Sequence, residues 1–227
     1  MAKHGKRYLQ ALSAAPEGVQ ELDVALSFLK ANPVAKFDET VDLQLRMGID
    51  PRKSENAIRG SASLPHGSGR TMRVIVFATG AAADEARKAD ADEVGMEDLI
   101  EKVKGGWTEF DVAIATPDAM KEVRKLGRVL GPRGLMPNPK TGTVTDDTAT
   151  AVALSKAGKV DFRMDRNGNI SIPVGKLSFD AQHLLENTNA VVSAVWNEKP
   201  VSAKGIYIKN YTVSSTMGVG LRVNISH

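Results

Sequence analysis

The sequence contains no cysteine, few aromatic residues and no long apolar run. The absence of cysteine from its 227 residues excludes disulfides, thiol nucleophiles and cysteine-built zinc sites, and it suits a reducing compartment. Aromatic residues make up only 5%, so the core must consist mostly of valine, leucine, isoleucine and alanine. The longest strongly apolar run, residues 74–78, is far shorter than the roughly 20 residues that span a bilayer. Because the basic N-terminus also lacks the apolar segment of a signal peptide, we expect a cytoplasmic protein with no membrane partner.

The usual motifs of enzymes and nucleotide-binding proteins are missing as well. Residues 67–71, GSGRT, fail as a Walker phosphate loop, because Leu64 and Arg70 stand where its first glycine and its lysine belong. DRNGN at 165–169 fails as a calcium loop, since its glycine is misplaced and Lys176 occupies the place of the bidentate glutamate. We therefore expect no catalytic residue, no cofactor and no bound metal. The histidines, which show no metal-binding spacing, are His4, His66, His183 and His227.

Positive charge is unevenly distributed along the chain. The formal net charge is only +3, and the isoelectric point is about 9.0. Residues 1–66 hold nine basic against eight acidic side chains and residues 159–227 hold eight against five, whereas residues 67–158 hold thirteen against fourteen. Within that middle part, residues 121–140 carry six basic groups against the single Glu122. A basic patch beside an acidic face is typical of an oriented polyanion binder, but a solvated mixed-charge surface explains the counts equally well.

Both ends of the chain show the periodicity of helices and half-buried strands. Residues 5–14, 18–31 and 179–196 are predicted helices, and the apolar stripe of the second comprises Val19, Leu22, Leu26 and Leu29. Alternating apolar residues predict strands at 41–47, 58–65, 160–164 and 170–174, followed by one or two final strands within 205–225. Asn167 and Gly168 predict a hairpin between the strands at 160–164 and 170–174.

In the middle of the chain, short apolar strands alternate with helices. The predicted strands are residues 73–78, 93–95 and 111–115, and the predicted helices are residues 81–90, 96–104 and 116–130. This alternation is typical of βαβ units around a parallel sheet. The predicted fold class is therefore α/β and α+β, with two domains. Residues 1–66 plus 159–227 are expected to form a discontinuous α+β domain, into which residues 67–158 insert as an α/β domain, with a hinge at Gly67, Gly69 and Gly158.

Residues 126–144, LGRVLGPRGLMPNPKTGTV, combine four glycines and three prolines with the basic residues Arg128, Arg133 and Lys140. Glycine permits unusual backbone conformations and proline fixes φ, so we interpret the stretch as a shaped, rigid, cationic loop. Such a loop usually binds an anionic ligand or supports a site that does. Its composition leaves open whether it binds RNA, binds a nucleotide or only stabilises its own fold.

Several specific stretches occur in one order along the chain. They are KHGKRY at 3–8, KFDETV at 36–41, MGIDPRKS at 47–54, RGSASLPHGSGR at 59–70, DVAIATPDAM at 111–120, the stretch 126–144, KAGKVDFR at 156–163, and AKGIYIK with SSTMG at 203–218. In this order they closely resemble the ribosomal protein L-one family of the bacterial large subunit, nearly end to end.

The resemblance implies a discontinuous domain joined by a hinge to an inserted Rossmann-like domain. It also implies a structural protein that binds large-subunit ribosomal RNA at a mobile stalk and meets transfer RNA leaving the exit site. Many family members repress their own operon by binding its messenger RNA. The expected partners are therefore these three RNAs, and the protein is expected to be a monomer within the ribosome.

By the same resemblance, the main RNA-binding surface comprises Lys36, Phe37, Thr40, Ser215, Thr216, Met217 and Gly218. The chemistry suits RNA, because an aromatic ring can lie against a base while lysine meets phosphate, and a threonine hydroxyl can pair with a 2′-hydroxyl. Taken alone, Phe37 and Met217 favour burial in the core; the resemblance reverses that interpretation.

Weaker candidates for RNA contacts are Arg163, Arg166, Lys176, Arg128, Arg133 and Lys140. Two positions depart from the family pattern. Val219 replaces a common proline, which predicts a looser turn, and Ser171 replaces a frequent histidine, which puts a base or ribose contact there in doubt. The alternative hypothesis is an α/β nucleotide-binding protein or enzyme that uses the middle domain, and it rests on strand–helix alternation alone.

Overall fold

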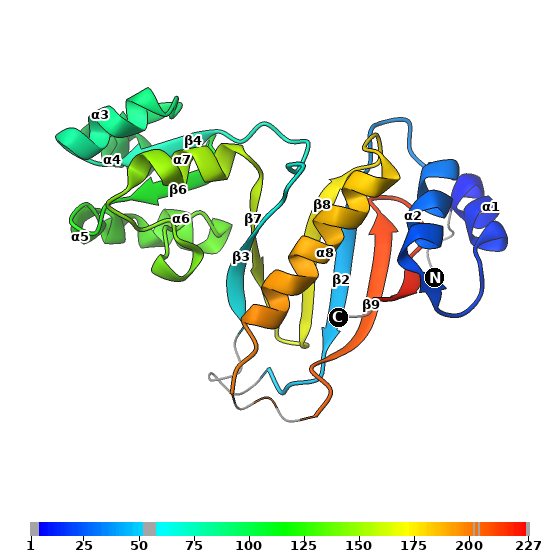
Figure 1. The fold of residues 1–227 in the computed structure, drawn as a ribbon. Helices are drawn as coiled ribbons and strands as arrows, with labels where there is room; N and C mark the ends of the chain where they lie inside the picture. Colours follow the sequence, from blue (N-terminus) through cyan, green and yellow to red (C-terminus); the bar gives the residue numbers. More distant parts are fainter. Residues whose placement is uncertain (1–4, 52–57, 202, 204, 226–227) are drawn as a thin grey trace. The chain divides into compact units, whose positions relative to one another are not determined.

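The computed structural model describes residues 5–51, 58–201, 203 and 205–225. The motif residues Lys3, His4, Arg52, Lys53, Ser54 and Lys204, and the histidine His227, lie outside this part of the chain. Two compact units are present: an outer unit, Met1–Gly69 with Val160–His227, and an inserted unit, Arg70–Lys159. The mixture of helices, a largely antiparallel sheet and a parallel sheet confirms the predicted fold class (Figure 1).

The outer unit is built around a five-stranded sheet with the strand order β1-β10-β9-β2-β8. Its elements are α1 (Lys6–Ala14), β1 (Gln20–Glu21), α2 (Leu22–Ala31), β2 (Thr40–Met47), β3 (Arg59–Ser63), β7 (Lys159–Arg163), β8 (Asn169–Lys176), α8 (Ala181–Asn197), β9 (Ile208–Ser215) and β10 (Leu221–Asn224). Strand β2 lies antiparallel between β8 and β9. Helices α2 and α8 pack on one face of this sheet (Figure 1).

The alternation in β2 determines which face of the sheet is covered. Val41, Leu43 and Leu45 are buried in the core beneath the helices, whereas Gln44 and Arg46 on the opposite face are exposed. Burying each leucine side chain contributes about 2 kcal/mol, so a register shift of one residue would lose several such contributions at once. The other face of the sheet therefore remains polar and accessible.

The second predicted helix begins later than its periodicity suggests. Gln20 and Glu21 instead pair with β10 as the short parallel strand β1, so α2 starts at Leu22. Val19, expected on the buried stripe, is 63% exposed, while Leu22, Leu26 and Leu29 are buried as predicted. Pairing with a strand from the far end of the chain overrides the local helical pattern there.

The predicted hairpin at Asn167 and Gly168 is wrong as a strand pairing. A tight turn does form, closed by a 2.8 Å hydrogen bond from the Asp165 N–H to the Asn169 carbonyl, with Gly168 at φ 79°. However, β7 pairs with β3 in a separate two-stranded sheet, and β8 pairs with β2. The turn reverses the chain locally, but the two strands separate because each finds its partner elsewhere in the sequence.

The inserted unit contains a three-stranded parallel sheet with the order β5-β4-β6. Its elements are β4 (Val74–Phe77), α3 (Ala81–Lys88), β5 (Glu93–Gly95), α4 (Glu97–Lys104), β6 (Val112–Ala115), α5 (Met120–Val123), η2 (Arg124–Leu126), α6 (Gly127–Arg133), η3 (Pro139–Thr141) and α7 (Thr148–Lys156). Strand β4 is apolar throughout because Val74 and Val76 enter one hydrophobic core and Ile75 and Phe77 enter another. This two-sided burial confirms the predicted parallel sheet.

The glycine- and proline-rich stretch at 126–144 is only partly a loop. Its first half forms helix α6, which contains Pro132 and ends where Gly134 adopts φ 73°. The helix forms despite the low helix propensity of glycine and proline because Leu126 and Leu130 are fully buried in the adjoining core. In the second half, Thr143 and Asn138 are joined by hydrogen bonds that shape the turn before the next helix.

Candidate nucleic-acid interface

Two segments that are far apart in the sequence meet at the start of β2. The first comprises residues 36–40, and the second is the turn 215–218 after β9. The Thr216 N–H donates to the Thr40 carbonyl at 3.0 Å, and the Thr40 N–H donates to the Thr216 hydroxyl at 2.9 Å. The second segment is closed by a 3.0 Å hydrogen bond from the Gly218 N–H to the Ser215 carbonyl. We call these two segments the paired-segment surface.

The paired-segment surface presents large apolar side chains to solvent. Phe37 is 59% exposed and Met217 is 55% exposed, although both are residues that folding normally buries. Lys36 and Thr216 are also exposed, and Thr40 is half-buried beside them. The structure therefore brings together an aromatic ring, a thioether, an ammonium group and a hydroxyl group on one surface.

A buried carboxylate, which sequence reasoning missed, holds the two segments together. Glu39 is 0% exposed. One oxygen, Oε1, accepts from the N–H groups of Val34 at 2.9 Å and Ala35 at 2.6 Å. The other, Oε2, accepts from the Ser215 hydroxyl at 2.6 Å and the Met217 N–H at 3.1 Å. Local sequence carries no signal for this role beyond the motif KFDETV, because two of the four donors come from the distant turn 215–218.

The hydrogen bonds decide the ionisation state of Glu39. Burial raises its pKa, but the four hydrogen bonds favour the carboxylate and together leave the pKa below its ordinary value. A buried carboxylate with four donors is satisfied without a cationic partner. Glu39 therefore acts inside the protein, where its hydrogen bonds fix the backbone of the surface.

Ser215 and Gly218 occupy the surface differently from what their motif suggests. Ser215 is only 4% exposed and its hydroxyl donates to Glu39, so its side chain supports the turn and does not face a ligand. A Cβ on Gly218 would lie 2.2 Å from Ser215 Oγ, so glycine is needed there for the internal contact.

Val219 is buried at 6% and the turn before it is closed by a hydrogen bond, so valine does not leave this turn open.

The weaker candidates in the outer unit lie toward opposite ends of β8, with Arg163 and Arg166 before its first residue and Lys176 at its last. Lys176 pairs in register with Thr40, and its ammonium group donates to the Thr40 hydroxyl at 2.9 Å. Arg163 and Arg166 are exposed, but they flank the turn at the other end, where Asn169 pairs with Arg46. Seven residues of strand separate the two ends, roughly 20 Å at the usual rise. The structure brings Lys176 to the paired-segment surface and leaves the two arginines away from it.

Arg128, Arg133 and Lys140 belong to the inserted unit. All three side chains are exposed, two on α6 and one on η3. Each is therefore accessible to a ligand, and all three belong to the glycine- and proline-rich stretch 126–144.

The expected hinge glycines all have positive φ angles. The values are 70° for Gly67, 69° for Gly69 and 105° for Gly158, a region in which only glycine is free of strain. The chain crosses from the outer unit into the inserted unit directly after Gly69. It crosses back after Lys159, the residue that follows Gly158.

Helix α1 adds residues that the sequence interpretation did not assign to the site. Lys6, Arg7 and Tyr8 line a groove of about 680 Å³ together with Val34 and the turn residues 216–218. The Arg7 guanidinium donates to the Val34 carbonyl at 3.3 Å. The motif KHGKRY marks this helix in the sequence, but only the fold places its cations beside Met217.

The open face of the sheet carries a second hollow of about 570 Å³. Its polar lining is Gln44, Arg46, Asn169, Ser171, Asn210, Thr212 and Arg222. Ser171 is exposed there and contributes a hydroxyl group to the lining. This hollow lies on the same strands as the paired-segment surface and adds two guanidinium groups to the polar face.

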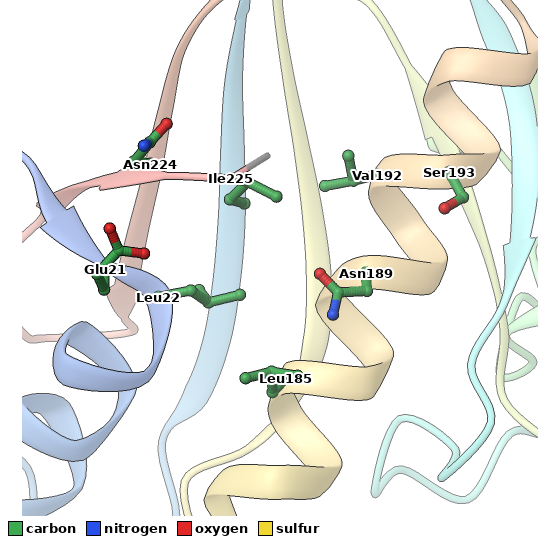
Figure 2. Close-up of a pocket in the computed structure, with 8 residues that line it drawn as sticks. All are labelled: Glu21, Leu22, Leu185, Asn189, Val192, Ser193, Asn224 and Ile225. Atoms are coloured by element: carbon green, nitrogen blue, oxygen red, sulfur yellow. The ribbon is translucent and has the colours of Figure 1, made fainter. Parts of the chain in front are cut away.

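A third hollow, of about 290 Å³, has a different character (Figure 2). Leu22, Leu185, Val192 and Ile225 give it an apolar lining, around which Asn189, Ser193, Asn224 and Glu21 are arranged. Its one charged lining residue, Glu21, is acidic, so it does not suit a phosphate backbone.

In the part of the chain that the structure describes, no group of three or more histidine, aspartate or glutamate side chains is placed to hold a metal ion. No helix within the described ranges is both long enough and apolar enough to cross a bilayer. The exposed aromatic, basic and hydroxyl groups at the start of the interior strand β2 are of the kinds that RNA-binding proteins present to their ligand.

Comparisons with known proteins identify the family. The model of the Ribosomal protein L1p/L10e family matches residues 29–219. Two proteins named large ribosomal subunit protein uL1, from Chlamydia trachomatis serovars D and L2, are each 51% identical over 233 residues, which covers 99% of this chain and 97% of each relative. The chain belongs to the Ribosomal protein L1p/L10e family and is not an enzyme, so the alternative of an enzyme built on the middle domain is set aside.

Proposed function

We propose that this protein is a structural component of the large ribosomal subunit that binds ribosomal RNA through the paired-segment surface. The observation that carries the proposal is the exposure of Phe37 and Met217 on a backbone that Glu39 holds rigid. A surface whose binding conformation is already formed loses little conformational entropy when it binds. Phe37 would stack on a base or sugar, Lys36 would meet a phosphate, and Thr216 would pair with a 2′-hydroxyl.

The extent of the binding surface follows from the neighbouring features. The groove beside Lys6 and Arg7 adjoins the turn residues 216–218, and the hollow with Arg46 and Arg222 lies farther along the open face of the same sheet. Each cation that neutralises a phosphate releases counterions, so affinity should depend steeply on salt.

Binding to a stalk ribosomal RNA fragment, measured by gel shift at several salt concentrations, tests the proposal. The expected result is a linear fall of log affinity with log salt, with a slope that indicates several phosphate contacts. An affinity that is insensitive to salt, or equal for an unrelated folded RNA, would contradict it.

We further propose that the inserted unit meets transfer RNA at the exit site. The exposed basic residues Arg128, Arg133 and Lys140 support this role, because they lie within residues 121–140, which carry six basic groups against the single Glu122. Replacing all three with glutamine should weaken transfer RNA binding and leave ribosomal RNA affinity unchanged. The hinge is proposed at the two crossings, next to Gly69 and Gly158, and the protein is proposed to act as a monomer within the ribosome, in the cytoplasm.

Repression of its own operon is a second proposed role. One RNA-binding surface can hold one RNA at a time, so a messenger that resembles the ribosomal site would compete for it. A transcript of the operon leader should therefore be displaced by the ribosomal RNA fragment, and replacing Phe37 with alanine should weaken both complexes. Simultaneous binding of both RNAs would argue against a shared surface.

A further inference from the structure

The turn that follows β8, residues 176–179, is hydrogen-bonded to the first segment of the paired-segment surface. The Leu177 N–H donates to the Glu39 carbonyl at 2.8 Å. The N–H and hydroxyl groups of Ser178 donate to the two carboxylate oxygens of Asp38 at 3.1 and 2.8 Å. With the bond from Lys176 to Thr40, each residue of 38–40 is attached to this turn.

The opposite side of the same turn packs against the chain as it leaves the outer unit. A Cβ on Gly69 would lie 2.7 Å from Cγ of Lys176 and 3.0 Å from Cζ of Phe179. Gly69 is also at φ +69°, so this position excludes a side chain for two separate reasons. The aliphatic stem of Lys176 thus lies against Gly69, while its ammonium group donates to Thr40 in the first segment of the paired-segment surface.

Residues 66–69, which we call the exit segment, are themselves fixed to the outer unit. The buried Asn187 accepts from the His66 N–H at 3.1 Å and donates to the carbonyls of Gly67 at 3.1 Å and Val174 at 2.8 Å. The His66 ring stacks on His183 with centroids 4.0 Å apart and contacts Glu186 at 2.6 Å. The exit segment is therefore held in place up to the residue before the inserted unit begins.

We propose that the turn 176–179 couples the exit segment to the RNA-binding surface, with Lys176 as a positioning residue. This inference rests on the proposed function and adds a regulatory property to the same site. The ammonium group of Lys176 faces acceptors of the protein, the Thr40 hydroxyl and the Asp38 carbonyl, the latter at 3.5 Å. Displacing the exit segment shifts the lysine stem and releases Thr40, and Thr40 is bonded to Thr216.

Coupling of this kind is reciprocal. If the position of the exit segment changes RNA affinity, then bound RNA must change the stability of the exit segment by the same factor. RNA bound at the paired-segment surface would thereby change the stability of the segment through which the chain enters the inserted unit.

A double-mutant cycle on the full chain tests the coupling. Gly69→Ala and Lys176→Met are each expected to weaken binding of the stalk ribosomal RNA fragment by on the order of threefold to thirtyfold. The double variant should lose much less than the product of the two single losses, because both changes break one connection. Gly205→Ala is the matched control, since Gly205 has φ +78° but no atom within 4 Å of its Cβ position. The proposal is overturned if the affinity loss of the double variant equals the product of the two single losses to within twofold. It is also overturned if Gly205→Ala weakens RNA binding as much as Gly69→Ala does.

The salt dependence of binding separates positioning from direct phosphate contact. A positioning role predicts that Lys176→Met lowers affinity and leaves the slope of log affinity against log salt unchanged. A slope reduced by about one would mean that Lys176 contacts phosphate, and it would overturn the proposal.

Hydrogen exchange provides the reciprocal measurement. RNA should slow amide exchange at 66–69 in the unmodified protein and not in Lys176→Met. Equal protection in both proteins overturns the coupling, whereas failure of the unmodified protein to bind the RNA at all would be a failure of the proposed function. Thermal unfolding of each variant without RNA shows that a lost signal does not arise from an unfolded chain.

Discussion

The hydroxyl group of Ser215 donates a 2.6 Å hydrogen bond to Oε2 of Glu39, which is completely buried. This contact joins residues that are 176 positions apart and fixes the turn that presents Met217. Both residues lie within sequence motifs that suggest ligand contact, yet both act inside the protein. Their role is to hold the exposed residues around them in one conformation.

Replacing Glu39 with glutamine should destabilise the outer unit. An amide cannot accept all four hydrogen bonds, so buried N–H groups lose a charged acceptor, at a cost of about 2–4 kcal/mol. Urea unfolding measures the change, and RNA affinity should fall with it because the turn 215–218 loses its anchor. Asp118→Asn is a matched control, since the Asp118 side chain is 96% exposed and should change stability by less than about 0.5 kcal/mol. Equal stability of the two variants would contradict this role.

Stability should fall in acid partly through Glu39. Its pKa in the folded chain lies below the ordinary value of 4.5. A carboxyl group with a lowered pKa stabilises the fold at pH values above its pKa in the unfolded chain. This contribution is lost as the pH falls through its pKa in the folded chain. The unfolding free energy of the unmodified protein should therefore decrease below about pH 4.5 more steeply than that of Glu39→Gln. Parallel curves for the two proteins would show that Glu39 does not contribute.

Phe37→Ala and Met217→Ala should separate binding from folding. Both side chains are more than half exposed, so truncation should change stability by less than about 0.5 kcal/mol. Loss of stacking by Phe37 should weaken RNA binding by about 1–3 kcal/mol, which is roughly fivefold to over one-hundredfold. Val24→Ala is the control, because Val24 is 51% exposed on the helix-covered side. An unchanged affinity in both variants would mean that RNA binds elsewhere.

Two glycine-to-alanine changes should act in opposite directions. In Gly218→Ala the new Cβ would lie 2.2 Å from Ser215 Oγ, so the hydrogen bond to Glu39 breaks, and stability should fall by about 1–3 kcal/mol. In Gly131→Ala the new Cβ meets no atom within 4 Å on helix α6, so stability should rise by up to about 1 kcal/mol. Thermal unfolding compares them, and a stable Gly218→Ala would show that the turn can rearrange.

Local patterns were sufficient for most elements of this fold. The two-residue alternation from Val41 to Met47 predicts β2 and its buried face, because successive side chains of a strand point to opposite sides. The apolar run at 74–78 likewise predicts a strand covered on both faces. Phe37 could be assigned to the surface only through the family motif, since an isolated phenylalanine favours burial.

Long-range contacts decided what these patterns leave open. The pairing of β7 with β3, the start of α2 at Leu22 and the helix within 126–144 each depend on partners distant in sequence. The same holds for the functional surface, because Glu39 receives donors from residues 34–35 and from the distant turn 215–218, and Lys176 reaches Thr40 across a strand pair. A motif can indicate which residues matter, but hydrogen bonds and packing between distant segments determine whether each one faces a ligand or supports another residue. Those interactions exist only once the chain has folded.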